Sequence, residues 1–164
     1  MKKENIRYQL FCDIIHSFDE GCELTKEYDS LLHDYNGVVM FQAESQLIKT
    51  IGNHPGITAS DISQLFKTTS SASSQLIRKL REKGWVIQER NENNRRIWNL
   101  YLTEEGKKIY QAHYNFESRC YMRTFHSLDH FTEEELETYL KIQKCINETF
   151  KIDVKESQQL NIKP

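Results

Sequence analysis

Short hydrogen-bonding side chains and one cation cluster near the start of a predicted helix over residues 70–83. The outward face of this helix carries three serines, a glutamine and an arginine: Ser70, Ser71, Ser74, Gln75 and Arg78. In the major groove of DNA, glutamine can pair with adenine and arginine with guanine, and the unpaired N–H groups of a helix N-terminus favour phosphate. No acidic residue lies between Phe66 and Arg81. These side chains fit a surface that binds a nucleic acid.

Positive charge is concentrated in the same part of the chain. The whole sequence of 164 residues has a net charge of −2, but the thirty residues from Lys67 to Arg96 hold eight basic and three acidic side chains. This segment therefore carries +5 and the remainder −7. Such a local excess is the electrostatic footprint expected of a protein that binds a polyanion. Charge alone fits a solvated helix face equally well, and the order of the predicted elements separates these two interpretations.

Two short helices are predicted around this face, in the order of a helix-turn-helix motif. Apolar residues spaced three and four apart predict the first over residues 58–66 and the second over residues 70–83. A polar three-residue turn joins them, and Thr58 and Thr69 are the expected N-caps. Four residues of the second helix fall on its inward face: Ser73, Leu76, Ile77 and Leu80. Gly84 is expected to close this helix.

A basic β-hairpin is predicted directly after the second helix. Alternating apolar residues indicate strands over residues 85–90 and 96–102, with a polar turn over residues 91–95. The hairpin carries three candidate contacts: Arg90, Arg95 and Arg96. Such a hairpin can lie on the phosphate backbone with its tip toward the minor groove, while the preceding helix enters the major groove. Arg90 is on the strand itself and is either structural or a phosphate contact.

Further helices are predicted on both sides of this lobe. Helical spacing of apolar residues indicates helices over about residues 5–35, 104–127 and 132–150, the first ended by the Asn36-Gly37 pair. A winged helix of ~60 residues is too small to cover their apolar stripes. Six of their side chains are candidates for a core shared between two subunits: Leu10, Ile14, Phe18, Leu140, Ile146 and Phe150.

Composition and motifs exclude several classes of protein. The length fits one globular domain that buries its own core. No apolar run approaches a membrane span, and no apolar segment follows the N-terminal lysines, so we expect a cytoplasmic protein without a secretory signal. Nucleotide-binding loops, a nucleophile elbow and a His-Glu-x-x-His motif are absent from the sequence. We therefore predict no enzyme activity, no catalytic residue and no cofactor.

The central part of the sequence resembles the multiple-antibiotic-resistance regulator (MarR) family of bacterial and archaeal transcription factors. Five segments carry the resemblance: Ile62–Phe66, Leu76–Val86, Arg90, Asn94–Arg96 and Leu102–Gly106. Together these motifs are fairly specific, although no single one is. The resemblance covers about residues 41–110 well, and the number and order of the helices extend it toward both ends.

The resemblance implies one MarR-like domain over residues 1–164, mainly α with a small β-hairpin wing. About residues 41–102 would form the winged helix-turn-helix lobe that binds DNA, and about residues 5–35 and 104–150 would form dimerisation helices. The implied function is that of a homodimeric repressor of a palindromic operator in double-stranded DNA, with a small-molecule effector that modulates binding and no membrane partner.

The wing departs from the family's usual pattern at one position. MarR wings usually carry Asp-x-Arg, in which the aspartate orients the arginine that reaches the minor groove. This sequence has Asn94 at the aspartate position and Arg96 at the arginine position. The positive tip is therefore kept while the orienting ion pair is lost, unless Glu92 replaces it.

Two other function classes remain open. One is a metal- or redox-responsive regulator of the same fold, for which the candidate zinc ligands are His113, His126 and His130. A helix corner predicted over residues 128–132 spoils the four-residue spacing of the last two. Cys12 is a candidate redox sensor, but Asp13 beside it disfavours a reactive thiolate. The other class is a winged-helix protein-interaction module without DNA binding, which the +5 segment disfavours.

Overall fold

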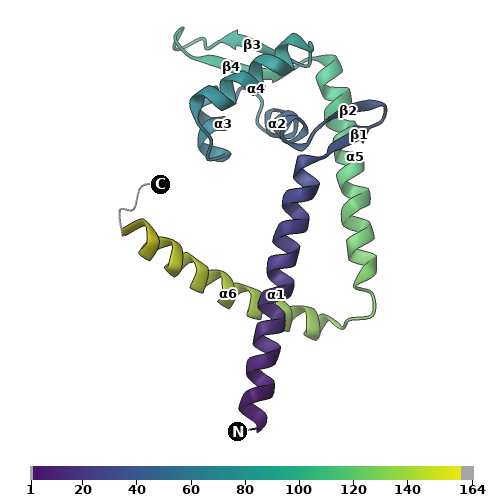
Figure 1. Cartoon of the computed structure of the whole chain (residues 1–164). Coiled ribbons are helices and arrows are strands. Elements are labelled where there is room, and N and C mark those ends of the chain that lie inside the picture. Colours follow the sequence, from purple (N-terminus) through teal and green to yellow (C-terminus); the bar gives the residue numbers. More distant parts are fainter. Residues whose placement is uncertain (1, 160–164) are drawn as a thin grey trace. The chain divides into compact units, whose positions relative to one another are not determined.

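The computed structural model describes residues 2–159 and divides the chain into two compact units, of which the first ends at Ser118. Each unit is described by itself. The elements follow in chain order (Figure 1): α1 (Lys2–Ser30), β1 (Leu32–Tyr35), β2 (Val38–Phe41), α2 (Gln42–Asn53), α3 (Ala59–Leu65), α4 (Ser70–Glu82), β3 (Val86–Arg90), β4 (Trp98–Leu102), α5 (Glu104–Ser127) and α6 (Glu133–Gln159). Within the described range, every helix is too short or too polar to cross a bilayer.

Local hydrogen bonds fix the two helices of the helix-turn-helix. Thr58 Oγ1 accepts from the Asp61 N–H at 3.2 Å, and the Asp61 carboxylate accepts from the Thr58 N–H at 3.0 Å, which forms a capping box at α3. Thr69 Oγ1 accepts from the Ala72 N–H at 3.2 Å at the start of α4. Gly84 follows α4 with a φ of +73°, the left-handed conformation that ends helices. Both caps and the stop are as predicted.

The wing is an antiparallel hairpin of β3 and β4. Its register pairs Val86 with Leu102 and Arg90 with Trp98. The Leu100 N–H also donates to the Ile57 carbonyl at 3.0 Å, which joins the hairpin to the chain before α3. The wing is therefore attached to the helix-turn-helix by backbone hydrogen bonds and keeps a fixed position beside it.

A single apolar core underlies the first unit. Its buried members are Tyr35, Met40, Leu47, Ile48, Ile51, Ile57, Ile62, Ile77, Leu80, Val86, Leu100 and Ile109. In α4, Ser73, Ile77 and Leu80 are buried and Leu76 is half-buried, which confirms the predicted inward face. Because this face is fixed in the core, the opposite face of α4 must point outward.

The segment between α1 and α2 differs from the prediction. The first helix was expected over residues 5–35, but α1 ends at Ser30 and a hairpin of β1 and β2 follows. Asn36 and Gly37, expected to end a helix, have φ of +59° and +87° and form the tight turn between Tyr35 and Val38. Asn-Gly strongly favours this hairpin turn because φ is positive at both central residues. The helix prediction was wrong because so short an apolar run fits either period.

The last two helices begin where the sequence predicts. In the first turn of α6, Thr132 Oγ1 accepts from the Glu135 N–H at 3.2 Å, and the Glu135 carboxylate accepts from the Thr132 N–H at 2.8 Å. The helix continues to Gln159 rather than ending near residue 150, since no glycine or proline follows before that point. None of the residues of α6 is buried.

Candidate nucleic-acid interface

The outward face of α4 presents the five predicted polar side chains together. Ser70, Ser71, Ser74, Gln75 and Arg78 are all exposed. A hydrogen bond of 2.8 Å between Thr68 Oγ1 and Ser73 Oγ ties the inner side of the helix start to the preceding turn. Arg78 Nε lies 3.9 Å from the Glu82 carboxylate, and both side chains are 70% exposed. Such an exposed pair is weak, so the guanidinium can turn toward a ligand at little cost.

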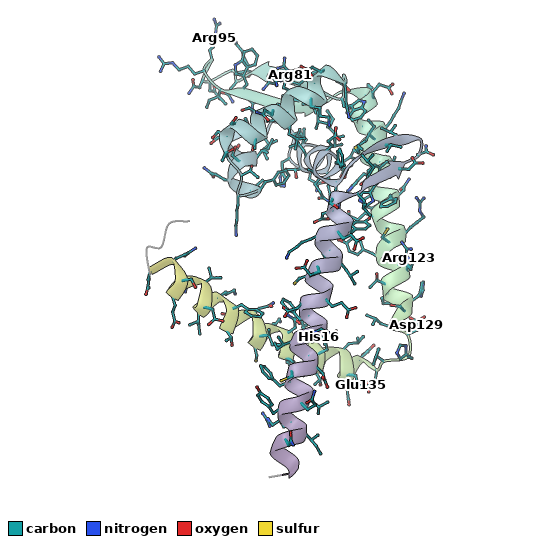
Figure 2. The ribbon with its side chains drawn as sticks, in the orientation of Figure 1. His16, Arg81, Arg95, Arg123, Asp129 and Glu135 are labelled. Atoms are coloured by element: carbon teal, nitrogen blue, oxygen red, sulfur yellow. The ribbon has the colours of Figure 1, made fainter. Side chains whose placement is uncertain are left out.

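Arg95 and Arg96 are exposed in the loop that joins β3 to β4. Figure 2 shows Arg95 at the tip of this loop, directed away from the lobe. Asn91 Oδ1 accepts from the N–H groups of residues 93 and 94, both at 3.0 Å, and Asn94 Oδ1 accepts from the Arg96 N–H at 3.1 Å. The asparagine that replaces the family's aspartate therefore holds the backbone of Arg96 rather than its guanidinium. In the described residues, Glu92 forms no ion pair with Arg96.

Arg90 is engaged with the wing itself. Its Nη1 donates to the Arg95 carbonyl at 3.0 Å, and its guanidinium carbon lies 4.9 Å from the centre of the Trp98 ring. Of the two roles left open by the sequence, this geometry favours the structural one. Arg90 supports the loop that carries the other two arginines.

A buried ion pair beneath α4 is a feature that sequence reasoning missed. Glu44, in the first turn of α2, lies 2.6 Å from Lys83 Nζ and 3.3 Å from Lys79 Nζ. Burial by itself raises the pKa of Glu44, but hydrogen bonds from Lys83 and the Phe41 N–H, with the charge of Lys83, outweigh it and the net pKa is lowered. No local signal could have found this contact, because its partners are 39 residues apart.

The candidate zinc ligands do not come together as a site. In the described part of the chain, no group of three or more histidines, cysteines or acids is arranged to hold a metal ion. His126 lies in the last turn of α5 and contacts Asp129 at 3.4 Å, whereas His130 lies in the following turn against Phe131. The helix corner therefore breaks their spacing, as expected. His113 is buried, and Cys12 is a half-buried free thiol.

The sequence matches both a protein-family model and a curated protein. A model described as MarR family matches residues 42–97. The curated HTH-type transcriptional regulator YybA of Bacillus subtilis (strain 168) is 31% identical over 88 residues, which are 54% of this chain and 57% of that relative. The chain thus matches little more than half the length of that protein.

Two solved structures share the fold over most of both chains. Streptococcus pneumoniae FabT, solved in complex with DNA, has a TM-score of 0.66 at 24% identity and covers 88% of this chain and 97% of its own. Lactococcus lactis ZitR, a zinc-responsive MarR family member, has a TM-score of 0.70 at 19% identity, with coverages of 86% and 99%.

The segment matched by the family coincides with the lobe that displays the polar face of α4 and the arginine loop. The fold likeness extends beyond this segment, over 88% and 86% of this chain. This family and this fold are those of transcriptional regulators rather than enzymes. Over residues 42–97, about a third of its length, the chain matches the MarR family.

Proposed function

We propose that this protein is a sequence-specific transcriptional regulator that binds double-stranded DNA through its winged helix-turn-helix. The observation that carries the proposal is the exposed polar face of α4, fixed by its buried opposite face and flanked by an arginine loop. In this arrangement Gln75 and Arg78 contact base edges in the major groove. Ser70, Ser71 and Ser74 are short side chains at the helix start, which allow the backbone N–H groups to approach phosphate.

The wing supplies the second part of the interface. Arg95 and Arg96 contact phosphates and the minor groove, and Arg90 supports their loop from β3. Phosphate contacts carry little sequence information but add affinity that depends on salt. The wing therefore contributes affinity, whereas α4 contributes the choice of sequence.

We propose that the regulator acts as a homodimer. The support is the set of apolar side chains that the terminal helices leave exposed, among them Leu10, Ile14 and Leu140. Obligate dimers commonly bury more than ~2,000 Å² of such surface. Two-fold symmetry would place two α4 helices about 34–36 Å apart and match a palindromic operator. By likeness to the family, we further propose a repressor whose binding a small molecule modulates.

Selection of bound duplexes from a random pool, followed by mobility shifts on the selected sequence, tests the proposal. Gln75→Ala and Arg78→Ala should each weaken binding by about 1–3 kcal/mol and relax the preference at one or two base pairs. Gln111→Ala, which removes an exposed glutamine of α5, is the matched control. If both α4 variants bind the selected duplex as tightly as the parent, α4 is not the reading helix.

The wing has a separate signature in the salt dependence. Each phosphate contact removed should reduce the slope of log K against log salt by about 0.9. Arg95→Ala combined with Arg96→Ala should therefore flatten the slope on selected and random duplexes alike. An unchanged slope would rule out a wing that contacts DNA.

A further inference from the structure

The carboxylate of Glu44 is enclosed directly beneath α4. Its side chain is 3% exposed, and both of its oxygens are engaged. Oε1 contacts Lys83 Nζ at 2.6 Å and Lys79 Nζ at 3.3 Å, while Oε2 accepts from the Phe41 N–H at 3.2 Å. One acid of α2 thus holds two bases, one in the last turn of α4 and one at the residue that follows it.

The Glu44 carboxylate is poorly hydrated, whereas Lys79 and Lys83 keep part of their side chains in water. A buried carboxylate is costly unless charged partners and hydrogen bonds satisfy it, and removal of one partner leaves an uncompensated charge. Here the Glu44 carboxylate has three such partners, namely the two lysines and the Phe41 N–H. The exposed Arg78–Glu82 pair on the same helix lacks this protection and is screened by water.

The two lysines are also turned back onto the lobe by aromatic rings. Lys79 Nζ lies 5.7 Å from the centre of the Phe41 ring, and Lys83 Nζ lies 4.5 Å from that of Trp85. Their side chains are only 48% and 32% exposed. These two lysines are held by contacts within the protein, whereas the side chain of Arg78 is 70% exposed.

We propose that Glu44 is a specificity-determining positioning residue, which holds Lys79 and Lys83 away from DNA phosphates and ties α4 to α2. The proposal rests on the proposed function, in which α4 contacts DNA. A long, flexible lysine beside DNA binds any sequence, because the phosphate contacts it makes do not depend on the bases. The contact of Glu44 with Lys79 and Lys83, which we call the clamp, limits this sequence-independent attraction.

Glu44→Gln tests the clamp, since it removes the charge but keeps the shape and an acceptor for the Phe41 N–H. The probes are a duplex selected from a random pool by the parent protein and a random-sequence duplex of equal length. The freed lysines should steepen the slope of log K against log salt on the random duplex by about 0.9 for each lysine. The ratio of the two affinities should fall at least about tenfold, because base contacts fix how the protein docks on the selected duplex, whereas on the random duplex it docks wherever the freed lysines reach phosphates.

Two further variants separate positioning from a general electrostatic or structural effect. Glu82→Gln makes the same charge change at an exposed acid of α4, and we expect it to alter the affinity ratio less than about twofold. Glu44→Gln combined with Lys79→Met and Lys83→Met removes the lysines together with their acid. This triple variant should restore the parent slope and ratio, because no freed ammonium group remains.

The outcomes separate this inference from the proposed function. If Glu44→Gln weakens both duplexes equally with an unchanged slope, or if the triple variant fails to restore the ratio, Glu44 is merely structural. If Glu44→Gln does not fold by circular dichroism, Glu44→Gln with Lys83→Met leaves one free lysine and should show a slope excess of about 0.9; an absent excess overturns the clamp. A parent protein that selects no sequence contradicts the proposed function itself.

Discussion

Apolar side chains are buried in the winged helix-turn-helix lobe but exposed along the C-terminal helix α6. In the lobe, Ile48, Ile51 and Leu80 are fully buried within a single chain. Along α6, by contrast, no residue is buried, and its exposed large apolar side chains are Leu136, Tyr139, Leu140, Ile142, Phe150, Ile152 and Val154. The same helical spacing of apolar residues therefore gives a buried face in the lobe and an exposed face on α6.

This difference indicates which parts of the chain bury their apolar residues without a second copy of the protein. The lobe has a closed core, so its stability is set within one copy. Contiguous apolar faces are rare on monomeric proteins and usually mark an interface. We therefore expect substitutions in the lobe to act on folding, and substitutions in the apolar face of α6 to act on assembly.

The largest expected effect comes from a charge on the α6 face. Leu140 is 52% exposed within one chain, so Leu140→Asp should leave the folded monomer intact. In the proposed dimer the carboxylate would be buried without a partner, which costs several kcal/mol. We expect dimerisation to weaken more than about 100-fold by sedimentation at micromolar concentration.

Lys141→Asp is the control for that experiment. It makes a larger charge change on a neighbouring face of α6, where Lys141 forms only an exposed pair with Glu137. It should remain a dimer. A Leu140→Asp variant that stays fully dimeric would remove α6 from the proposed interface and with it the contrast between the two regions.

The second effect is a cavity in the lobe. Leu80 is fully buried, and Leu80→Ala should reduce the free energy of unfolding by about 2–5 kcal/mol. Urea titrations at two protein concentrations should show the same reduction, because the cavity forms within one chain. Leu140→Ala should instead cause a loss that grows on dilution. Identical concentration dependence for the two variants would contradict a self-contained lobe.

Substitutions of two glycines, one beside the wing and one in α1, test the same comparison with smaller expected effects. A Cβ on Gly106 would collide with the Trp85 carbonyl oxygen, whereas a Cβ on Gly21 of α1 would meet nothing within 4 Å. Gly106→Ala should lower the free energy of unfolding by about 1–3 kcal/mol. Gly21→Ala should raise it by about 0.5–1 kcal/mol, because alanine favours the helix. Thermal melting measures both signs, and equal shifts would show that α5 is not packed this closely against the wing.

The smallest effect is a dependence on pH. Burial lowers the pKa of His113 from its ordinary value of 6.5, with Glu117 opposing and Lys49 and His33 adding to the shift. The neutral side chain is favoured in the folded state, so its contribution to stability is complete above about pH 6.5 and is lost as the pH falls toward the folded pKa. Each pKa unit corresponds to about 1.4 kcal/mol.

Urea midpoints between pH 7.5 and 5.5 test this assignment. The midpoint of the parent should fall with pH, and His113→Phe, which suits the neighbouring Tyr35 ring, should flatten that fall. The pKa of Glu44 is also lowered, but its contribution is lost only below the ordinary value of 4.5 and lies outside this range. Parallel curves for the two proteins would exclude His113 as the titrating group.

Most of the helices could be predicted from the sequence because their signals are local. The caps at Thr58, Thr69 and Thr132 act over three residues, and Gly84 ends α4 by its own conformation. The outward face of α4 follows from the spacing of its apolar residues. The exception is the β1–β2 hairpin, where a short apolar run matched two periods and the Asn-Gly turn decided between them.

The sequence by itself therefore determined the order of the elements and the polar set on α4, because three- and four-residue spacings encode caps and faces. Only the tertiary structure decided that Arg90 braces the wing and that Glu44 holds Lys79 and Lys83. The physical reason is that an ion pair depends on burial and on the approach of distant segments. Nothing within four residues of Glu44 distinguishes it from a solvated acid at the start of a helix.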